Sequence, residues 1–363
     1  MKDKLNELRE QGKNIYSFSK LGTFNNCEYE YYNTYVLKKK GIDNIYTLMG
    51  SELHNGIEKI YKNELDIKKF KKDFENRLIE LEMNGVSFPS ESIGDSWKAD
   101  VGHFMNNFNK IDSKMILEKL MVFEIAEGIY LQGYVDAILP SEKGKPYVSI
   151  YDWKTSSKFT GKKLNEAGRQ LLMYKLALEQ TTNLKVDKIL WFMVKYVYVC
   201  THGKTKVIKK MCNRGKWVKE MRKQLEKQMK NLRYDDFEIE VMLDNAVKEN
   251  NLNSLPEEVK NKFWLEDCTV EYEVTDEKVN ELKNYIADTV ERIENKDRED
   301  EKQWQPVKIN KFNSFYCSVL CGHRKTCKFY KEFLESNKFK KKNKIKIKVQ
   351  GEINFYEILS RLL

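Results

Sequence analysis

Residues 129–155, IYLQGYVDAILPSEKGKPYVSIYDWKT, show the alternation of apolar and polar side chains that is typical of a β-hairpin. We expect strands over 129–139 and 148–155, because the Pro- and Gly-containing segment 140–146 between them has the composition of a turn. The run Met121 to Ile125 predicts a further strand just upstream. The three strands together form an antiparallel meander.

Two charged side chains of the second hairpin strand share one face. Because side chains alternate along a strand, Asp152 and Lys154 point to the same side of the sheet, and Tyr151 and Trp153 point to the other. One face is therefore charged and the other is aromatic.

The hairpin also predicts a close pair of carboxylates. If Asp136 lies opposite Asp152, the turn is centred on Gly144, where turn residues are found. Directly opposed residues have Cβ atoms about 4.5–5.5 Å apart, so the two acids repel unless a cation lies between them. Mg²⁺ or Mn²⁺ suits such an oxygen-rich site, and Lys154 could then orient a water or bind a phosphate. The alternative is a surface hairpin with a salt-bridged Asp/Lys pair.

Helical periodicity surrounds the meander. Residues 50–82 and 164–179 predict helices, and Ile189 to Val199 predicts a buried strand. The order helix, three strands, helix, strand predicts a mixed α/β core. His54 lies beside the apolar stripe of the first helix. A single His there is usually a core-edge residue, but its position ahead of an Asp and an Asp-x-Lys makes it a candidate ligand.

Length and composition predict a folded, non-membrane protein. The chain has 363 residues, of which 41% are hydrophobic, and this allows two domains or one domain with a large insertion. Its longest uninterrupted apolar run, Ile189 to Val194, is far shorter than the roughly 20 residues that cross a bilayer. The polar N-terminus has no signal-peptide pattern, so we expect a cytoplasmic protein, and seven cysteines in such a chain favour metal binding or free thiols over disulfides.

The formal net charge of +10 is unevenly distributed. Residues 336–363 form a basic C-terminal tail, residues 204–233 form a basic block, and residues 235–301 are strongly acidic. These blocks are either solvated helix surfaces or a phosphate-facing patch beside an acidic region. We interpret residues 1–335 as one domain with a charged, mostly helical insertion at about 204–300.

Six motifs in this order resemble the RecB-type branch of the PD-(D/E)xK nucleases. The resemblance is specifically to its iron-sulfur members, such as the CRISPR-associated exonucleases and the AddB nuclease domain. The motifs are Ser17-Phe18-Ser19-Lys20-Leu21 with Cys27, Gly50-Ser51-Glu52-Leu53-His54, Gly133-Tyr134-Val135-Asp136, Ile150-Tyr151-Asp152-Trp153-Lys154-Thr155, Gln170-Leu171-Leu172-Met173-Tyr174, and Cys317, Cys321 and Cys327. The resemblance implies a restriction-endonuclease-like core, a mixed central sheet flanked by helices.

The resemblance also implies roles for individual residues. His54, Asp136 and Asp152 would bind a catalytic Mg²⁺ or Mn²⁺, and Lys154 would assist the attacking water. Gln170 and Tyr174 would line the site, which agrees with their i,i+4 spacing on one helix face. Without the other motifs, this pair would be the polar edge of an amphipathic helix.

By the same resemblance, four cysteines would hold a metal cofactor. Cys27 would join Cys317, Cys321 and Cys327 around a [4Fe-4S] cluster, and structural zinc is the alternative, with His323 able to replace one cysteine. The family usually has two residues between the first two C-terminal cysteines, whereas this chain has three. The isolated cysteines are expected to be ordinary core or surface residues; they are Cys200, Cys212 and Cys268.

The sequence as a whole predicts a metal-dependent deoxyribonuclease, an exonuclease acting on single-stranded DNA or free ends in recombination, repair, replication or spacer-type processing. The alternative is a catalytically silent or partner-dependent nuclease-fold subunit that binds DNA in a larger complex. The partners expected for such a complex are a helicase, an integrase or a recombination protein. No Walker A motif occurs, so any helicase would come from another chain.

Overall fold

The computed structural model describes residues 1–336 and divides the chain into two compact units. Unit 1 comprises Met1–Leu21 and Ile45–Glu291, and unit 2 comprises Gly22–Asn44 and the chain from Arg292 onward. All but the first residue of the predicted basic tail, 336–363, lies outside the described residues.

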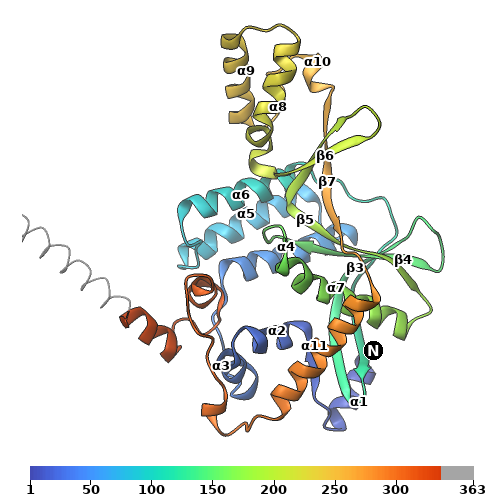
Figure 1. Ribbon diagram of the computed structural model, residues 1–363, viewed down its shortest axis with the longest axis vertical. Helices are drawn as coiled ribbons and strands as arrows, with labels where there is room; N and C mark the ends of the chain where they lie inside the picture. Colours follow the sequence, from blue (N-terminus) through green and yellow to red (C-terminus); the bar gives the residue numbers. More distant parts are fainter. Residues whose placement is uncertain (337–363) are drawn as a thin grey trace, which may run out of the picture. The chain divides into compact units, whose positions relative to one another are not determined.

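A mixed sheet of seven strands forms the centre of unit 1 (Figure 1). The main path runs β1-β3-β4-β5-β6, with β2 paired to β3 and β7 paired to β5. The β1–β3 and β4–β5 pairs are parallel and the others are antiparallel, so the predicted mixed α/β core is confirmed. The strands are β1 (Ile15–Ser17), β2 (Ile116–Ala126), β3 (Ile129–Pro140), β4 (Tyr147–Lys154), β5 (Lys185–His202), β6 (Val207–Asn213) and β7 (Phe263–Glu271).

The predicted hairpin register is confirmed. β3 and β4 pair Ala137 with Tyr151 and Leu139 with Ser149, and continuing this register by one residue places Asp136 opposite Asp152. The turn contains Gly144, whose φ of 73° lies in the left-handed region that glycine adopts without strain.

Three helices cover the aromatic face of this hairpin: α4 (Ile45–Tyr61), α5 (Ile67–Met83) and α6 (Glu91–Asn106). Their apolar faces pack against Ala137, Leu139, Tyr151 and Trp153 in one hydrophobic cluster. The predicted single helix over 50–82 is therefore wrong in one respect, because the chain breaks between α4 and α5. Asp66 caps α5 by accepting a hydrogen bond from the Lys69 amide, which starts a new helix there.

Helix α7 (Lys162–Thr181) packs against β2, β4 and β5. Its buried face includes Leu171, Leu172 and Tyr174, and Gln170 on the same helix contacts Lys154 of β4. Since Lys154 points away from the aromatic face, α7 covers the charged face of the hairpin. The α4–α6 layer and α7 thus enclose the two sides of the sheet.

Region 204–300 contains helices and two strands. α8 (Trp217–Asn231), α9 (Asp236–Glu249) and α10 (Glu257–Lys260) share a second hydrophobic cluster with the far end of β5, and α11 (Asp276–Glu294) follows β7. β6 and β7 pair with β5, so part of the sequence that we expected to be mostly helical extends the sheet. The charged residues of β6 and β7 interrupt the alternation of apolar and polar side chains from which a strand is predicted. Among residues 1–336, no helix has both the length and the apolar character that a membrane span needs.

In unit 2, sequence-distant segments share an aromatic core. Trp304, which is almost fully buried, stacks on Tyr31 and Tyr32, and Phe24 meets it edge-on. The buried carboxylate of Glu30 accepts hydrogen bonds from the Tyr316 hydroxyl and from a C-terminal backbone amide. The short helices here are the end of α2 (Phe18–Asn26), α3 (Glu28–Tyr31) and the π-helical turns Tyr32–Val36 and Tyr316–Leu320. Residues near Cys27 are thereby joined to residues near Cys317.

Glycine 56 determines how closely α4 and α5 pack. A Cβ at this position would lie 1.9 Å from a ring carbon of Phe70, whereas a Cβ at Gly102 of α6 would meet nothing within 4 Å. We predict that Gly56→Ala destabilises the protein by about 1–3 kcal/mol through overpacking. The matched change Gly102→Ala should stabilise it by roughly 0.5–1 kcal/mol, because alanine favours helix. Thermal unfolding of both variants measures this, and an unchanged Tm for Gly56→Ala would contradict the packing.

Candidate active site

The six predicted site residues of unit 1 form one connected group. His54 comes from α4, Asp136 from β3, Asp152 and Lys154 from β4, and Gln170 and Tyr174 from α7. The contacts between them are His54 Nδ1 to Asp136 Oδ2 at 3.3 Å, Lys154 Nζ to Asp152 Oδ2 at 2.7 Å, Lys154 Nζ to Gln170 Oε1 at 3.2 Å, and Gln170 Nε2 to the Tyr174 hydroxyl at 2.8 Å. Helices on both sides of the sheet therefore contribute to one site at the β3–β4 hairpin.

Asp136 is a buried acid beside another acid. Burial and the neighbouring Asp152 carboxylate raise the pKa of Asp136 well above its usual value. Its Oδ2 accepts a hydrogen bond of 3.1 Å from the backbone amide of Trp153, which fixes the carboxylate across the two strands. The arrangement holds more negative charge than the surrounding groups neutralise.

Asp152 and Lys154 form a buried ion pair. The Asp152 side chain is only 2% exposed, and its Oδ2 has no hydrogen bond of good geometry within residues 1–336, although Lys154 Nζ is close. Burial alone would lower the pKa of Lys154, but the carboxylates of Asp152 and Asp136 outweigh it and raise the pKa. Lys154 is therefore a fixed positive charge at neutral pH.

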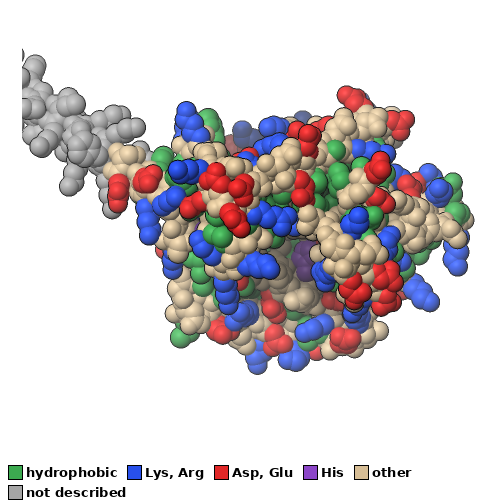
Figure 2. All heavy atoms as spheres, turned by 90° about the horizontal axis from the view of Figure 1, so that it is seen from below, with side chains coloured by type: hydrophobic (Ala, Val, Ile, Leu, Met, Phe, Trp, Pro, Cys, Tyr) green, Lys and Arg blue, Asp and Glu red, His purple; other side chains and the backbone are tan. Residues whose placement is uncertain are grey.

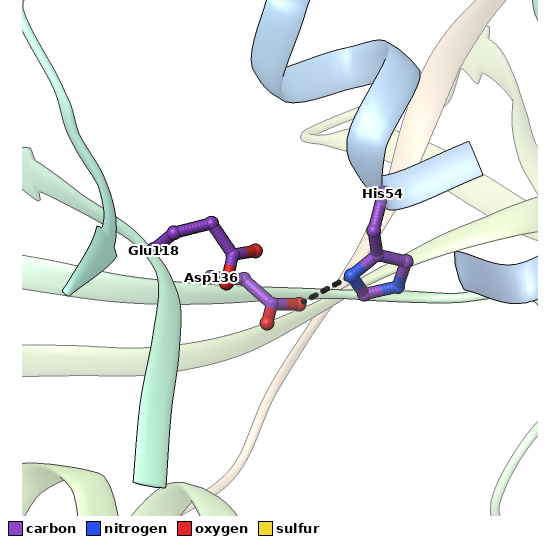
Figure 3. A group of neighbouring side chains, drawn as sticks. All are labelled: His54, Glu118 and Asp136. Carbon is purple, nitrogen blue, oxygen red and sulfur yellow. Dashed lines mark ion pairs between the residues drawn. The ribbon is translucent and has the colours of Figure 1, made fainter. Parts of the chain in front are cut away.

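His54 is poised as a neutral ligand. Burial lowers its pKa below the usual 6.5, although the Asp152 carboxylate acts in the opposite direction. At neutral pH the imidazole is uncharged, which is the form that coordinates metals. Figure 3 shows the ring turned toward Asp136 from the helix above the strands.

The structure adds Glu118, which the sequence reasoning missed. Pairs on either side of it, Leu117 with Ala137 and Lys119 with Val135, put Glu118 at the register position opposite Asp136. Its φ of 46° is in the left-handed region, which is unfavourable for a residue other than glycine and common at functional sites. Burial raises the pKa of its carboxyl, and the nearby Glu58 raises it further. If the strand had been predicted to begin at Ile116 instead of Met121, its pairing with the next strand would have placed Glu118 opposite Asp136.

These residues fit a divalent cation. His54, Glu118 and Asp136 each offer a ligand atom, and the three atoms lie within 4.8 Å of one another (Figure 3). This compact group contains Glu118 and does not include Asp152, which differs from the ligand set implied by the resemblance. The carboxylates of Glu118 and Asp136, whose burial raises their pKa values, are negative charges that a bound cation would stabilise. Oxygen-rich sites of this kind suit Mg²⁺ or Mn²⁺.

The four cysteines expected at a metal site lie together in unit 2. Cys27, Cys317, Cys321 and Cys327 line one pocket with aromatic and apolar neighbours. Burial and the neighbouring Cys27 and Cys327 raise the pKa of Cys317 to about 11, so its thiolate requires a compensating cation. The other three cysteines are buried separately in unit 1. His323 is buried and contacts the Thr34 hydroxyl at 3.0 Å.

Comparison with known families agrees with this geometry. The model of the PD-(D/E)XK nuclease superfamily matches residues 15–328, so the chain belongs to that superfamily. No curated protein is similar enough to be matched. The match spans the hairpin, the flanking helices and the cysteine segments, and it supports a metal-dependent nuclease.

Replacing the Asp136 carboxylate by a neutral amide should relieve the repulsion between Asp136 and Asp152. We predict that Asp136→Asn raises the Tm of the metal-free protein at neutral pH by about 2 °C or more, because a buried charge is lost while its hydrogen bond can remain. The difference should shrink as the pH falls toward the acid range, where Asp136 is protonated in both folded and unfolded states.

Thermal unfolding in EDTA and in Mn²⁺ checks this prediction. Wild-type protein should gain stability from Mn²⁺, and Asp136→Asn should lose most of that gain. A destabilised metal-free Asp136→Asn, or an undiminished Mn²⁺ effect, would count against the site.

Proposed function

We propose that this nuclease is a DNA exonuclease that requires Mg²⁺ or Mn²⁺ and hydrolyses phosphodiester bonds at the β3–β4 hairpin. The observation that carries the proposal is the convergence of His54, Glu118 and Asp136 beside the buried Asp152–Lys154 pair. Metal ligands and a fixed ammonium group are the two elements that phosphodiester hydrolysis needs in one place.

The metal site would be formed by His54, Glu118 and Asp136, with Asp152 at its border. A bound Mg²⁺ or Mn²⁺ supplies Lewis acidity toward the phosphate and lowers the pKa of a bound water. Asp152 holds Lys154 by its ion pair, and the Lys154 ammonium can donate to a phosphate oxygen or orient the attacking water. The imidazole of His54, neutral at pH 7, completes the ligands without adding charge.

Gln170 and Tyr174 serve as positioning residues in this proposal. Gln170 accepts a hydrogen bond from Lys154 and donates one to the Tyr174 hydroxyl. The Lys154 ammonium group is therefore held by both Gln170 and Asp152. Gly133 makes room for this arrangement, because a Cβ there would lie 3.0 Å from the Tyr174 ring. The glycine of the sequence motif thus lets α7 approach β3 closely.

The resemblance supports exonuclease action on single-stranded DNA or free ends, in recombination, repair, replication or spacer-type processing. The alternative is a catalytically silent or partner-dependent subunit that needs a helicase, integrase or recombination protein. The intact set of acids and the lysine favours an active enzyme, because a silent copy has no need to keep such a costly buried cluster.

We also propose that Cys27, Cys317, Cys321 and Cys327 hold a [4Fe-4S] cluster. The family resemblance favours this cofactor over zinc, and the four cysteines line one pocket. Because the ligands come from both ends of the chain, a cluster would hold distant segments together.

For catalysis, Asp152→Asn and Lys154→Met should each reduce DNA cleavage by on the order of 100-fold or more, because Lys154 would act on the phosphate and Asp152 holds Lys154 in place. Lys72→Met, a change of an exposed lysine on α5, is the matched control and should cleave normally. End-labelled linear and circular single-stranded DNA, with Mg²⁺, Mn²⁺ or EDTA, measures both activity and the need for an end. Normal digestion by Asp152→Asn would refute the active site, and cleavage of circles would refute exonuclease action.

For the cluster, anaerobically purified protein should be brown, with broad absorbance near roughly 400 nm. Cys317→Ala should lose the colour and lower the Tm, whereas Cys268→Ala, a buried cysteine of unit 1, should keep the colour. Iron, sulfide and zinc analysis accompanies the spectra. Colourless wild-type protein with one zinc per chain would overturn the iron-sulfur assignment.

A further inference from the structure

Unit 1 contains a hollow of about 640 Å³ that the proposed chemistry does not use. It lies between the end of α4 and the segment that connects α6 to β2. Its polar lining includes Lys62, Lys110, Ser113 and Lys114, and Tyr61 contributes an aromatic side. Hollows of this size hold small ligands or parts of a polymer.

The hollow adjoins the candidate metal site. Leu117 lines it, and the next residue along β2 is Glu118, a candidate metal ligand. On the other side, Lys62 pairs with Glu58 at 2.5 Å, and Glu58 lies one helical turn after His54 on α4. Lys62 and Glu58 are both near enough to act electrostatically on the Glu118 carboxylate. A molecule bound in the hollow would therefore lie close to Glu118, one of the residues proposed to bind the metal.

The lysines give this hollow a positive lining. Lys110 is held firmly, because its Nζ donates to the carbonyls of Ile60 and Tyr61 and to Asn63 Oδ1. Lys114 is exposed at the edge, and no ion pair to it occurs within the described chain. Asp112 is the one acid among the lining residues, so basic groups outnumber acids.

On another part of the surface, basic and acidic side chains are mixed. Figure 2 shows one face on which Lys and Arg side chains are interspersed with Asp and Glu. The basic helix α8 exposes lysines too, but several of its basic groups already pair with acids, as Arg222 does with Asp244. Within residues 1–336, the hollow brings together the basic side chains of Lys110 and Lys114, an aromatic side and, through Lys62 and Glu58, proximity to Glu118.

We infer that this hollow binds the nucleotide next to the scissile phosphate, with a backbone phosphate of a single strand at Lys114, beside the Lys62–Glu58 pair. The inference rests on the proposed nuclease function and names a substrate subsite for it. Lys110 keeps the end of α4 in place and adds positive charge, and Tyr61 contributes to the lining of the hollow.

Binding of a fluorescein-labelled single-stranded oligodeoxynucleotide tests the inference. Fluorescence anisotropy in EDTA, over a series of salt concentrations, separates binding from turnover. The variant is Lys114→Ala, with exposed Lys72→Ala of α5 as the matched control. Loss of one phosphate contact should make the slope of log K against log salt shallower by about 0.7 for Lys114→Ala. Lys72→Ala should keep the wild-type slope.

A wild-type slope for Lys114→Ala, equal to that of Lys72→Ala, would overturn the subsite. In the cleavage assay, Lys114→Ala should raise KM several-fold with little change in kcat, because ground-state and transition-state binding are lost together. If the wild-type chain binds DNA through Lys114 but cleaves nothing, the proposed function fails and the subsite stands. If it cleaves and Lys114→Ala behaves as wild type, the subsite fails and the function stands.

Discussion

Two buried carboxylates on neighbouring strands, Asp136 and Asp152, are the constraint around which unit 1 is organised. The hairpin register forces them together, and burial makes their mutual repulsion costly. Lys154 neutralises one of them from the same strand, and Trp153 fixes the other through its backbone amide. A divalent cation, with the neutral imidazole of His54 as one of its ligands, can balance the remaining negative charge.

The two helical layers have different tasks around this pair. On one side, α4 delivers His54 while its apolar stripe packs with α5 on the aromatic face of the sheet. On the other side, α7 brings Gln170 and Tyr174 to Lys154 and lies close to β3 at Gly133. Hydrophobic packing of α4 and α7 therefore fixes the positions of the polar side chains of the site, such as His54 and Gln170. The left-handed backbone at Glu118 adds a third acid from β2 at the cost of local strain.

Much of this arrangement could be predicted from the sequence because it depends on local rules. Strand alternation and the position of the turn were enough to place Asp136 opposite Asp152. The spacing of Gln170 and Tyr174 was enough to place both on one helix face. Glu118 was missed because charged residues around it hid the start of β2, and its backbone conformation follows from tertiary packing. β6 and β7 were missed for a similar reason, since their lysines and acids resemble a charged helix surface. The predicted grouping of Cys27 with the C-terminal cysteines came from family resemblance, because loop closure over such a distance leaves no local signal.

Diffraction from crystals soaked in Mn²⁺, recorded where manganese scatters anomalously, tests the central claim most directly. The account predicts one strong anomalous peak within coordination distance of His54, Glu118 and Asp136, with Asp152 at its border. The same peak should be absent from crystals of Asp136→Asn. Well-ordered wild-type crystals with Mn²⁺ bound elsewhere, and none at this group, would contradict the account.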